Sequence, residues 1–493
     1  MSEVSIRTAA PRRIPVGACP CPLPLPCQCS YATLLRARAR GLLSGDPLLR
    51  NGHVLTMSSL VTAALGMLFW ILATRWYTAD TVGRSYAALS AAALLSGIGQ
   101  LNLGDVLVRF VPTAGRHTRR VVLRCYGLST TASAVAAVVF LVLIPSLAPA
   151  LAFLRDPVVA GSFIAATVGY TLFVLQDGAL TGLRRPHWVL AENSLFSVAK
   201  AVLLAAFAVW ALNSGILLSW SAALVISLAV TNVFLFRRAV PAHQRADRDG
   251  VPPPRMVRYA AADYLGSLFR LAAYNLMPLL VLGRLGAEQN AYFSLAWVIA
   301  YTFYLAALNM GSSLIVEAAR DPSRLAEHGR RVLRNAGVLI GAGVLVTVAA
   351  APWLLRFFGV DYAEHGTALL RLLALSALPN LLVGVAIDVA RAQRRMIRVM
   401  ALQCGLCVLV LALTLWLIPV MGLTGVGAAW LLAESALALP LLLTLRRWLG
   451  ASVKAAPATS VKAATAAPAT AEPAAAVPGA PAGRPAPVER SPR

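Results

Sequence analysis

Apolar residues in this chain occur in long blocks separated by short polar stretches, and not in the alternating pattern of a half-buried strand. Each block is about 20 residues long, the length that a helix needs to cross a hydrocarbon layer of about 30 Å. Helices satisfy their own backbone hydrogen bonds in such a layer. The pattern therefore predicts an all-α integral membrane protein with about twelve transmembrane helices.

The longest internal polar stretch divides the predicted spans into two groups of six. We place the spans at 54–74, 85–108, 125–147, 158–178, 188–211, 215–236, 259–283, 290–313, 336–355, 367–389, 399–418 and 424–445.

Five regions follow from this division. Compositions rich in Arg and Pro, or in Ala and Pro, cannot bury enough apolar surface to fold. We expect a disordered cytoplasmic extension at 1–53, an N-terminal six-helix bundle at 54–236, a cytoplasmic linker at 237–258, a C-terminal six-helix bundle at 259–449 and a disordered Ala/Pro-rich cytoplasmic tail at 450–493.

Basic residues are distributed unevenly between the two sides of the membrane. With the N-terminus in the cytoplasm, the cytoplasmic segments hold 36 Lys and Arg residues and the outer loops hold 5. Short loops rich in Lys and Arg remain on the cytoplasmic side. We therefore expect a multi-pass protein of the cytoplasmic (inner) membrane with both termini in the cytoplasm.

The composition agrees with this location. The chain is 58% hydrophobic and 13% charged, with a mean hydropathy of +0.71, whereas soluble domains are about 45–50% apolar. The net charge of +24 does not indicate nucleic-acid binding, because the basic residues lie in short loops and not along one face. We expect membrane lipids, and no nucleic acid, among its partners.

The two halves of the chain resemble each other weakly. Residues 101–104 (LNLG) match residues 308–311 (LNMG) at an offset of 207, which makes Asn102 and Asn309 equivalent candidate cavity residues. Three further pairs match at an offset of 210: Arg185 with Arg395, Gly215 with Gly425, and Trp220 with Trp430. Halves with an even number of spans have the same orientation, so we expect a pseudo-two-fold axis along the membrane normal and a cavity between the bundles, as in transporters.

A polar stripe follows the seventh predicted span. Asp263, Ser267, Arg270 and Tyr274 have the spacing i, i+4, i+7 and i+11, which places them on one helical face. Charged groups inside a membrane face protein or water. Pro278 removes a backbone hydrogen bond beside the stripe and bends the helix. We interpret this span as a bendable helix that lines a substrate cavity; the alternative is a structural pair of Asp263 and Arg270.

The fifth predicted span carries a second stripe. Asn193, Ser197 and Lys200 are at i, i+4 and i+7, and Glu192 lies about 100° around the helix. Lys200 is near mid-span and cannot reach either interface, so it needs a counter-charge or a water-filled cavity. It is either a cation that binds a ligand or one partner of an interhelical salt bridge.

Other kinds of chemistry have little support in the sequence. Four of the seven cysteines lie in CPCPLPLPCQC, which has no His nearby, so we expect no metal site and no cofactor. The chain lacks a G-x-x-x-x-G-K-[ST] loop for ATP. The outer loops are too short for the paired carboxylates of a membrane glycosyltransferase. We therefore expect a protein that is not an enzyme.

Four stretches together resemble a known family: LATRWYTADTVGRSYAALS, GQLNLGDVLVRFVP, LQDGALTGLRRPHWVLAENSLFSVAK and YLGSLFRLAAYNLMPLLVLGRLGAEQNAYFSLAWVIA. This is the polysaccharide transporter branch of the multidrug, oligosaccharidyl-lipid and polysaccharide (MOP) exporter superfamily, which contains the O-antigen and exopolysaccharide flippases. The similarity covers about 54–449. It implies two six-helix bundles around a cationic cavity, and alternating access for a lipid-linked oligosaccharide.

We therefore expect a transporter that flips a polyprenyl-diphosphate-linked oligosaccharide for polysaccharide or lipopolysaccharide biosynthesis. Arg270 and Lys200 suit a pyrophosphate, because cations in a low-dielectric cavity bind phosphate strongly. A polysaccharide polymerase and glycosyltransferases are partners that such a flippase would meet. The alternatives are an ion-coupled drug or small-molecule exporter of the same superfamily, and a membrane scaffold for polysaccharide assembly that transports nothing.

Overall fold

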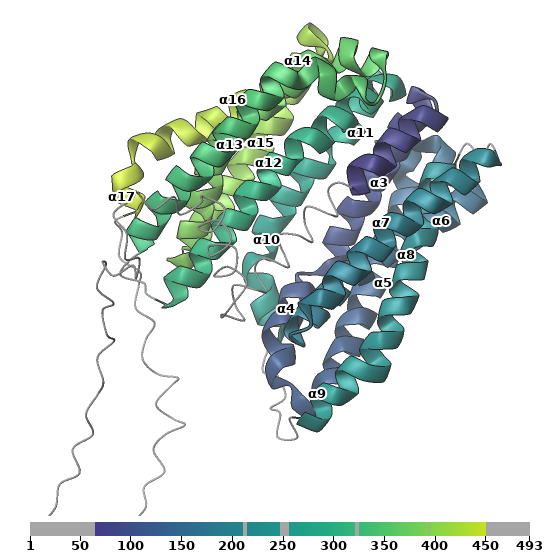
Figure 1. Ribbon diagram of the computed structural model, residues 1–493, viewed down its shortest axis with the longest axis vertical. Coiled ribbons are helices and arrows are strands. Elements are labelled where there is room, and N and C mark those ends of the chain that lie inside the picture. The colour runs from purple at the N-terminus through teal and green to yellow at the C-terminus, as the bar shows by residue number, and fades with distance from the viewer. Residues whose placement is uncertain (1–64, 211–213, 247–255, 321–324, 394, 450–493) are drawn as a thin grey trace, which may run out of the picture.

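The computed structural model describes residues 65–210, 214–246, 256–320, 325–393 and 395–449 (Figure 1). All regular secondary structure in these ranges is helical. The predicted extension at 1–53 and the predicted tail at 450–493 lie outside the described residues. So does the first part of the first predicted span.

The N-terminal lobe is formed by residues up to 246. After the short apolar helix Leu65–Trp76 come α3 (Ala79–Gln100), α4 (Leu103–Phe110), η1 (Val111–Thr113), η2 (Gly115–His117), α5 (Thr118–Leu147), η3 (Pro149–Arg155), α6 (Pro157–Gly182), α7 (Pro186–Val209), α8 (Gly215–Phe234), η4 (Leu235–Ala239) and α9 (Val240–Ala246).

The C-terminal lobe begins at residue 256. It contains α10 (Met256–Asn275), α11 (Met277–Leu285), α12 (Ala287–Arg320), α13 (Leu325–Arg356), α14 (Val360–Ala392), α15 (Met396–Met421), α16 (Leu423–Leu443) and α17 (Leu445–Leu449). In the described part of the chain, ten helices are long and apolar enough to cross a membrane, or eleven if the bent pair α3 and α4 forms one span. The helix Leu65–Trp76 falls in the remaining predicted span. The predicted all-α membrane fold is confirmed.

One predicted span is broken. The sequence predicts a single helix at 85–108, but α3 and α4 meet at 51°. Leu101 and Asn102, at the break, have φ angles of 53° and 54°. Asn tolerates this left-handed conformation, whereas it costs Leu about 1–2 kcal/mol, so packing must hold the break in place. The equivalent residues 308–311 lie inside the continuous helix α12, so the internal repeat does not extend to this feature.

The seventh span is interrupted beside its proline. Helix α10 ends at Asn275 and α11 starts at Met277, with Pro278 in the first turn of α11. The Leu276 amide donates to the Ala272 carbonyl at 2.9 Å, so the chain turns without losing that hydrogen bond. The interruption lies next to Tyr274, where the sequence predicts it, because proline lacks the amide hydrogen that would continue the helix.

The segment between the lobes starts later than the sequence predicts. Residues 237–246, predicted as linker, are helical, because α8 continues through the π-helical turn η4 into α9. Polar residues at the end of a span favour a loop prediction, but a helix can extend beyond the membrane when its end finds protein contacts. His243 of α9 provides one, since its Nε2 lies 3.1 Å from the Val111 carbonyl oxygen.

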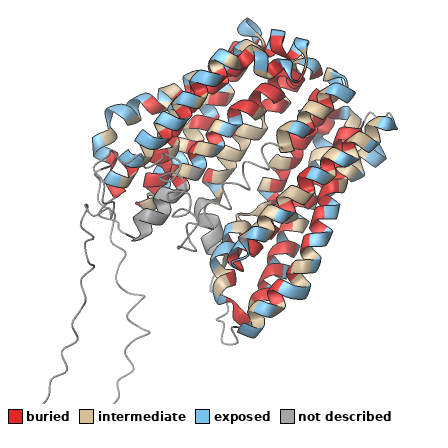
Figure 2. Cartoon of the chain, viewed as in Figure 1, coloured by how far each residue is buried: buried red, intermediate tan, exposed pale blue. Residues whose placement is uncertain are grey.

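Each lobe packs around one central helix, and the lobes meet through α3. Helix α14 contacts α12, α13 and α16, and α6 contacts α4, α5 and α8, while α3 crosses to α10, α11 and α12 of the other lobe. Figure 1 shows the lobes as two bodies, the N-terminal one purple to teal and the C-terminal one green to yellow. Large apolar side chains on the outer surfaces are exposed, as expected for helices that face lipid (Figure 2).

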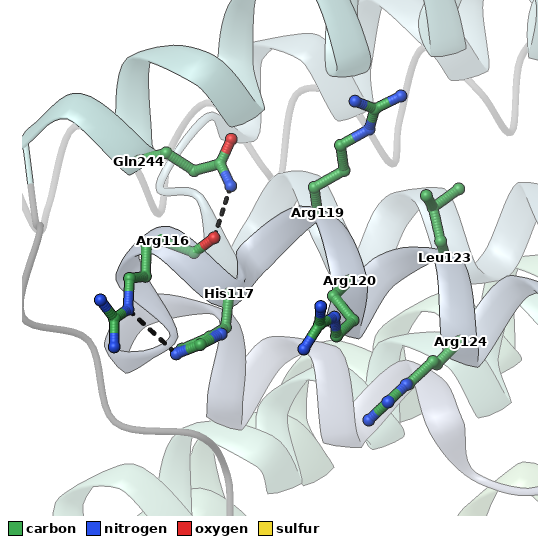
Figure 3. Close-up of a pocket in the computed structure, with 7 residues that line it drawn as sticks. All are labelled: Arg116, His117, Arg119, Arg120, Leu123, Arg124 and Gln244. Carbon is green, nitrogen blue, oxygen red and sulfur yellow. Dashed lines mark hydrogen bonds between the residues drawn. The ribbon is translucent and has the colours of Figure 1, made fainter.

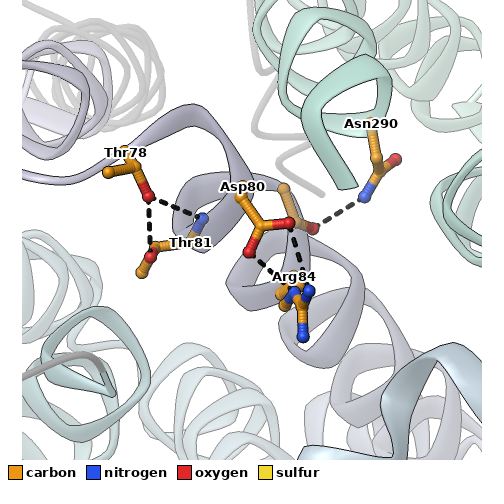
Figure 4. Close-up of polar contacts among 6 residues, drawn as sticks. Thr78, Asp80, Thr81, Arg84 and Asn290 are labelled. Carbon is orange, nitrogen blue, oxygen red and sulfur yellow. Dashed lines mark hydrogen bonds and ion pairs between the residues drawn. The ribbon is translucent and has the colours of Figure 1, made fainter. Parts of the chain in front are cut away.

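The closest approach of the lobes is between α3 and α12. The Asn290 side chain is fully buried, and its Nδ2 donates to the Gly83 carbonyl at 2.8 Å (Figure 4). A methyl group at Gly83 would overlap the Ala287 carbonyl, so only glycine permits this crossing. Gly83 and Asn290 are 207 residues apart, the offset of the LNLG and LNMG segments. Equivalent positions of the two halves therefore meet near the pseudo-two-fold axis.

Candidate functional site: a cavity between the lobes

A cavity of about 500 Å³ lies between the two lobes. Helices α3 and α6 line it from the N-terminal lobe, and α10 and α12 line it from the C-terminal lobe. A polar stripe on α10 and the break between α3 and α4 both lie on its wall. The cavity is thus formed at the place where the internal repeat predicts one, and by helices of both halves.

Four of the predicted site residues line this cavity together: Asn102, Ser267, Arg270 and Tyr274. Ser267 Oγ donates across the lobes to Asn102 Oδ1 at 3.4 Å. Arg270 is half-buried, and among the described lining residues it is the only charged side chain. The described lining of the cavity therefore carries one positive charge.

The Arg270 guanidinium has no carboxylate within ion-pair distance among the side chains that the structure describes. Its charge acts electrostatically on the Tyr274 and Tyr301 hydroxyls and on Asp388. Asp388 is itself paired with Arg391 at 3.5 Å. Within the described residues, no carboxylate therefore neutralises the positive charge of Arg270.

Aromatic rings form one continuous part of the remaining wall. Trp297, Tyr301 and Tyr304 follow one another on α12 at helical spacing and face the cavity with Tyr274. Tyr274 is stacked on Trp430 with a centroid distance of 5.5 Å and an interplanar angle of 4°. The wall continues into the N-terminal lobe with two further tyrosines, Tyr86 and Tyr170.

Sequence reasoning found only Tyr274 of this aromatic wall. The signal for the others is present, because residues 297, 301 and 304 have the i, i+4 and i+7 spacing of one helical face. This spacing did not identify a cavity wall, because aromatic residues at the same spacing also occur in packed membrane interfaces.

A buried carboxyl group lies behind the aromatic wall. Glu434 is fully buried on α16, and Asn380 Nδ2 donates to its Oε1 at 2.8 Å. Next to it, the Tyr304 hydroxyl lies 2.6 Å from Ser376 Oγ. The contact with Ser376 anchors the Tyr304 ring at its hydroxyl end. Glu434 was not among the predicted site residues, because its place nearer the end of the last predicted span suggested that water or headgroups reach it. The structure instead buries it completely.

The second predicted stripe lies elsewhere. Lys200 is 9% exposed inside the N-terminal lobe, and its Nζ is 5.0 Å from the ring centroids of both Phe69 and Phe196. It does not line the cavity that contains Arg270. No described carboxylate lies within ion-pair distance of it, so the predicted interhelical salt bridge is not formed within the described residues. Two aromatic faces stabilise the ammonium instead.

Glu192 and Asn193 belong to another buried polar cluster of the N-terminal lobe. Glu192 is 1% exposed, and with the Gln176 amide nitrogen turned toward it the two groups are 2.6 Å apart. Asn193 Nδ2 donates to the Val189 carbonyl at 2.9 Å. Neither residue lines the cavity, so the two predicted stripes do not converge on one site.

The side chains of two predicted site residues lie outside the part of the chain that the structure describes. The backbones of Asp263 and Asn309 are helical, in α10 and α12, but their side chains lie outside the described residues. The cysteine-rich tract at 19–29 is outside them as well. In the ranges that the structure covers, no group of three or more His, Cys, Asp or Glu side chains could hold a metal ion.

Solved structures with the same architecture are transporters. An outward-facing multidrug resistance MATE family transporter of the MOP superfamily aligns with a TM-score of 0.61 at 17% identity, covering 83% of this chain and 97% of that one. The chain has the fold of these transporters. A MOP superfamily transporter from Pyrococcus furiosus Vc1 aligns with a TM-score of 0.60 at 15% identity, covering 83% and 97%.

A third structure is that of the MATE multidrug transporter DinF-BH, solved in complex with a ligand. It aligns with a TM-score of 0.59 at 16% identity, covering 80% of this chain and 94% of that one. No protein-family model matches the chain, and no curated protein matches it in sequence. The MATE fold, with two bundles, is therefore established by structure alone.

Proposed function

We propose that this chain is a membrane transporter that flips a polyprenyl-diphosphate-linked oligosaccharide across the cytoplasmic membrane. One observation supports this substrate most directly: the described lining of the cavity between the lobes contains a single charged side chain, Arg270, among aromatic rings and neutral polar groups. Transport then proceeds by alternating access, in which the cavity opens to one side of the membrane at a time.

The diphosphate would bind at Arg270. A guanidinium group offers a planar fork of donors that matches phosphate oxygens, and the low dielectric of the cavity strengthens the interaction. Ser267 and Asn102 lie on the same wall and supply neutral hydrogen-bonding groups. Binding in this place would put the charge of the substrate where the two lobes meet.

The sugars would bind along the aromatic wall. Flat rings such as Trp297 and Tyr301 offer apolar faces with a polar edge, which suits the mixed surface of a sugar. The cavity of about 500 Å³ falls within the range of about 300–1,000 Å³ that is usual for ligand pockets. It would hold the diphosphate and the adjoining sugar, with the polyprenyl chain left in the bilayer.

A drug exporter is the second candidate, and the structural neighbours favour it. DinF-BH is a multidrug transporter whose structure holds a ligand, and an aromatic wall suits a flat organic molecule. A cationic drug would meet the uncompensated charge of Arg270, with no carboxylate in the described cavity lining to offset the repulsion. The sign of this charge is the reason to prefer an anionic substrate.

Export of the lipid-linked sugar tests the proposal through Arg270. We expect Arg270→Ala to reduce export by about tenfold or more at normal protein level, and Arg270→Lys to retain part of it, since lysine keeps the charge but loses the fork. The matched control is Arg284→Ala, which removes an exposed guanidinium from the end of the same span. Export is measured as surface polysaccharide per amount of membrane protein.

The same assay separates a ligand from a structural pair. If Arg270 only neutralises Asp263, each single alanine variant strands one charge, and the double variant recovers export. Recovery in the double variant, or equal loss in Arg284→Ala, would contradict the proposed role of Arg270. The drug exporter would be favoured if Arg270→Ala exported an organic cation normally and the wild-type protein exported no lipid-linked sugar.

A further inference from the structure

A basic groove lies at the end of the N-terminal lobe, away from the cavity. It is a shallow, open depression of about 640 Å³ lined by residues of η2, α5 and α9: Arg116, His117, Arg119, Arg120, Leu123, Arg124 and Gln244 (Figure 3). Four arginines thus share one hollow within nine residues of sequence. In the predicted orientation this hollow faces the cytoplasm.

Local contacts hold the groove in shape. Gln244 Nε2 of α9 donates to the Arg116 carbonyl at 2.7 Å, and Thr118 Oγ1 donates to the Gly115 carbonyl at 2.8 Å. Gly115 has a φ of +44°, a conformation that glycine adopts without strain. Arg116 Nε donates to His117 Nε2 at 3.2 Å (Figure 3). The turn that carries the arginines is therefore fixed by α9.

The four positive charges of the groove have no protein counter-charge in the part of the chain that the structure describes. There, none of these arginines has a carboxylate within ion-pair distance. Like charges at this spacing repel, and an anion that bridges them relieves the repulsion. Several guanidinium groups around one hollow are also well arranged to bind phosphate oxygens.

The groove continues into a surface that faces lipid. On α5, the side of the helix with Arg120 and Arg124 carries Leu128 and Val135, which are 52% and 57% exposed. Leu123, between the arginines, is also exposed. A ligand with a phosphate at one end and an apolar chain at the other would bind in the groove and also contact the exposed apolar side chains of α5. A free phosphate would bind only in the groove.

We propose that the groove binds the headgroup of an anionic phospholipid, with one acyl chain along α5. The arginines bind the phosphate, and the exposed Leu128 and Val135 contact the chain. Basic pockets beside transmembrane helices on the cytoplasmic side are suited to such lipids, because each Arg near the surface adds to the attraction. This site is separate from the substrate cavity and does not depend on the transported substrate.

The other lobe supplies a matched control. Arg330 and Arg334 on α13 have the same i, i+4 spacing as Arg120 and Arg124, and they are related to that pair by the offset of 210 residues. They also precede exposed apolar residues, Val338 and Leu345, which are 71% and 72% exposed. They do not line the groove. An acidic residue, Glu327, lies beside them and pairs with Arg331 at 3.4 Å.

Lipid binding to the purified full-length chain tests the site. The protein in neutral detergent is titrated with phosphatidylglycerol or with phosphatidylcholine of the same acyl chains, and bound lipid is counted by native mass spectrometry. We expect phosphatidylglycerol to bind more tightly, and the Arg120→Gln, Arg124→Gln variant to lose about tenfold or more of that affinity. The Arg330→Gln, Arg334→Gln variant should lose less than about twofold. These arginines are exposed, so a thermal melt should show both variants folded.

Three results would overturn the proposal. Equal affinity for the two lipids would show that the charges do not select an anion. Equal losses in the two arginine-pair variants would show general attraction at the membrane surface instead of a site. Complete displacement of phosphatidylglycerol by inorganic pyrophosphate at equal concentration would show that the exposed apolar side chains of α5 add nothing to lipid affinity. The groove would then be a site for soluble phosphates.

Discussion

Arg270 and Lys200 are both cations inside the helical bundle, yet they have different surroundings. Helical spacing predicts that Arg270 shares a face with Ser267 and Tyr274, and these three residues do line one cavity. The surroundings of Lys200 depend on Phe69, more than a hundred residues away in sequence. Spacing within one helix is thus readable from sequence, whereas the partner across a helix interface is not.

Lys200 should cost the protein stability. Each aromatic face contributes about 0.5–2 kcal/mol to an ammonium, but burial of an unpaired charge costs several kcal/mol. Lys200→Met keeps most of the side-chain length and removes the charge. We expect it to raise the melting temperature of the detergent-purified protein by about 2 °C or more.

Lys200→Ala is the control for packing, since it removes the charge and also leaves a cavity, and it should not be stabilising. A drop of several degrees for Lys200→Met would contradict this account, because it would show that the two rings stabilise the ammonium beyond its desolvation. Loss of transport in a stabilised Lys200→Met variant would assign the lysine a direct role in the transport cycle.

At the scale of helices, apolar block length predicted the spans, and special backbone positions explain the departures. The break in the second span depends on the left-handed Leu101, a conformation that the residue type does not favour, so sequence could not predict it. The break beside Pro278 was predictable because proline cannot donate the backbone hydrogen bond. The helical continuation to Ala246 was not, since it rests on contacts with η2 and η4 that exist only in the folded lobe.

The crossing of α3 and α12 should keep one end of the cavity closed. Gly83→Val introduces a side chain where the Ala287 carbonyl lies, so we expect the two lobes to separate at this end, which is the outer side in the predicted orientation. In a variant without native cysteines, Ser90→Cys in the cavity wall reports access. Labelling by a membrane-impermeant maleimide from outside should increase severalfold.

Gly127→Val is the matched control, because Gly127 is also helical but has open space around its Cα. Asn290→Ala gives a milder test of the same crossing, since it removes only the hydrogen bond to Gly83. It should increase labelling in the same direction. Unchanged labelling in folded Gly83→Val and Asn290→Ala proteins would contradict the role of this crossing as a closure.

At the scale of the whole molecule, the internal repeat predicted two lobes and a cavity between them. The contact between Gly83 and Asn290, equivalent positions of the two halves, agrees with an axis that passes between the lobes. The repeat could not predict the aromatic wall, because it is built mainly by the C-terminal lobe.

We propose that Arg270 makes the cavity select a lipid-linked diphosphate over an organic cation. The most direct test is binding of a short-chain polyprenyl-diphosphate-linked sugar and of ethidium, a flat organic cation, to the purified full-length protein and to Arg270→Ala. We predict that wild type binds the diphosphate more tightly than ethidium, and that Arg270→Ala weakens diphosphate binding by about tenfold or more without weakening ethidium binding. Tighter binding of ethidium by wild type, with diphosphate binding unchanged in Arg270→Ala, would contradict the account.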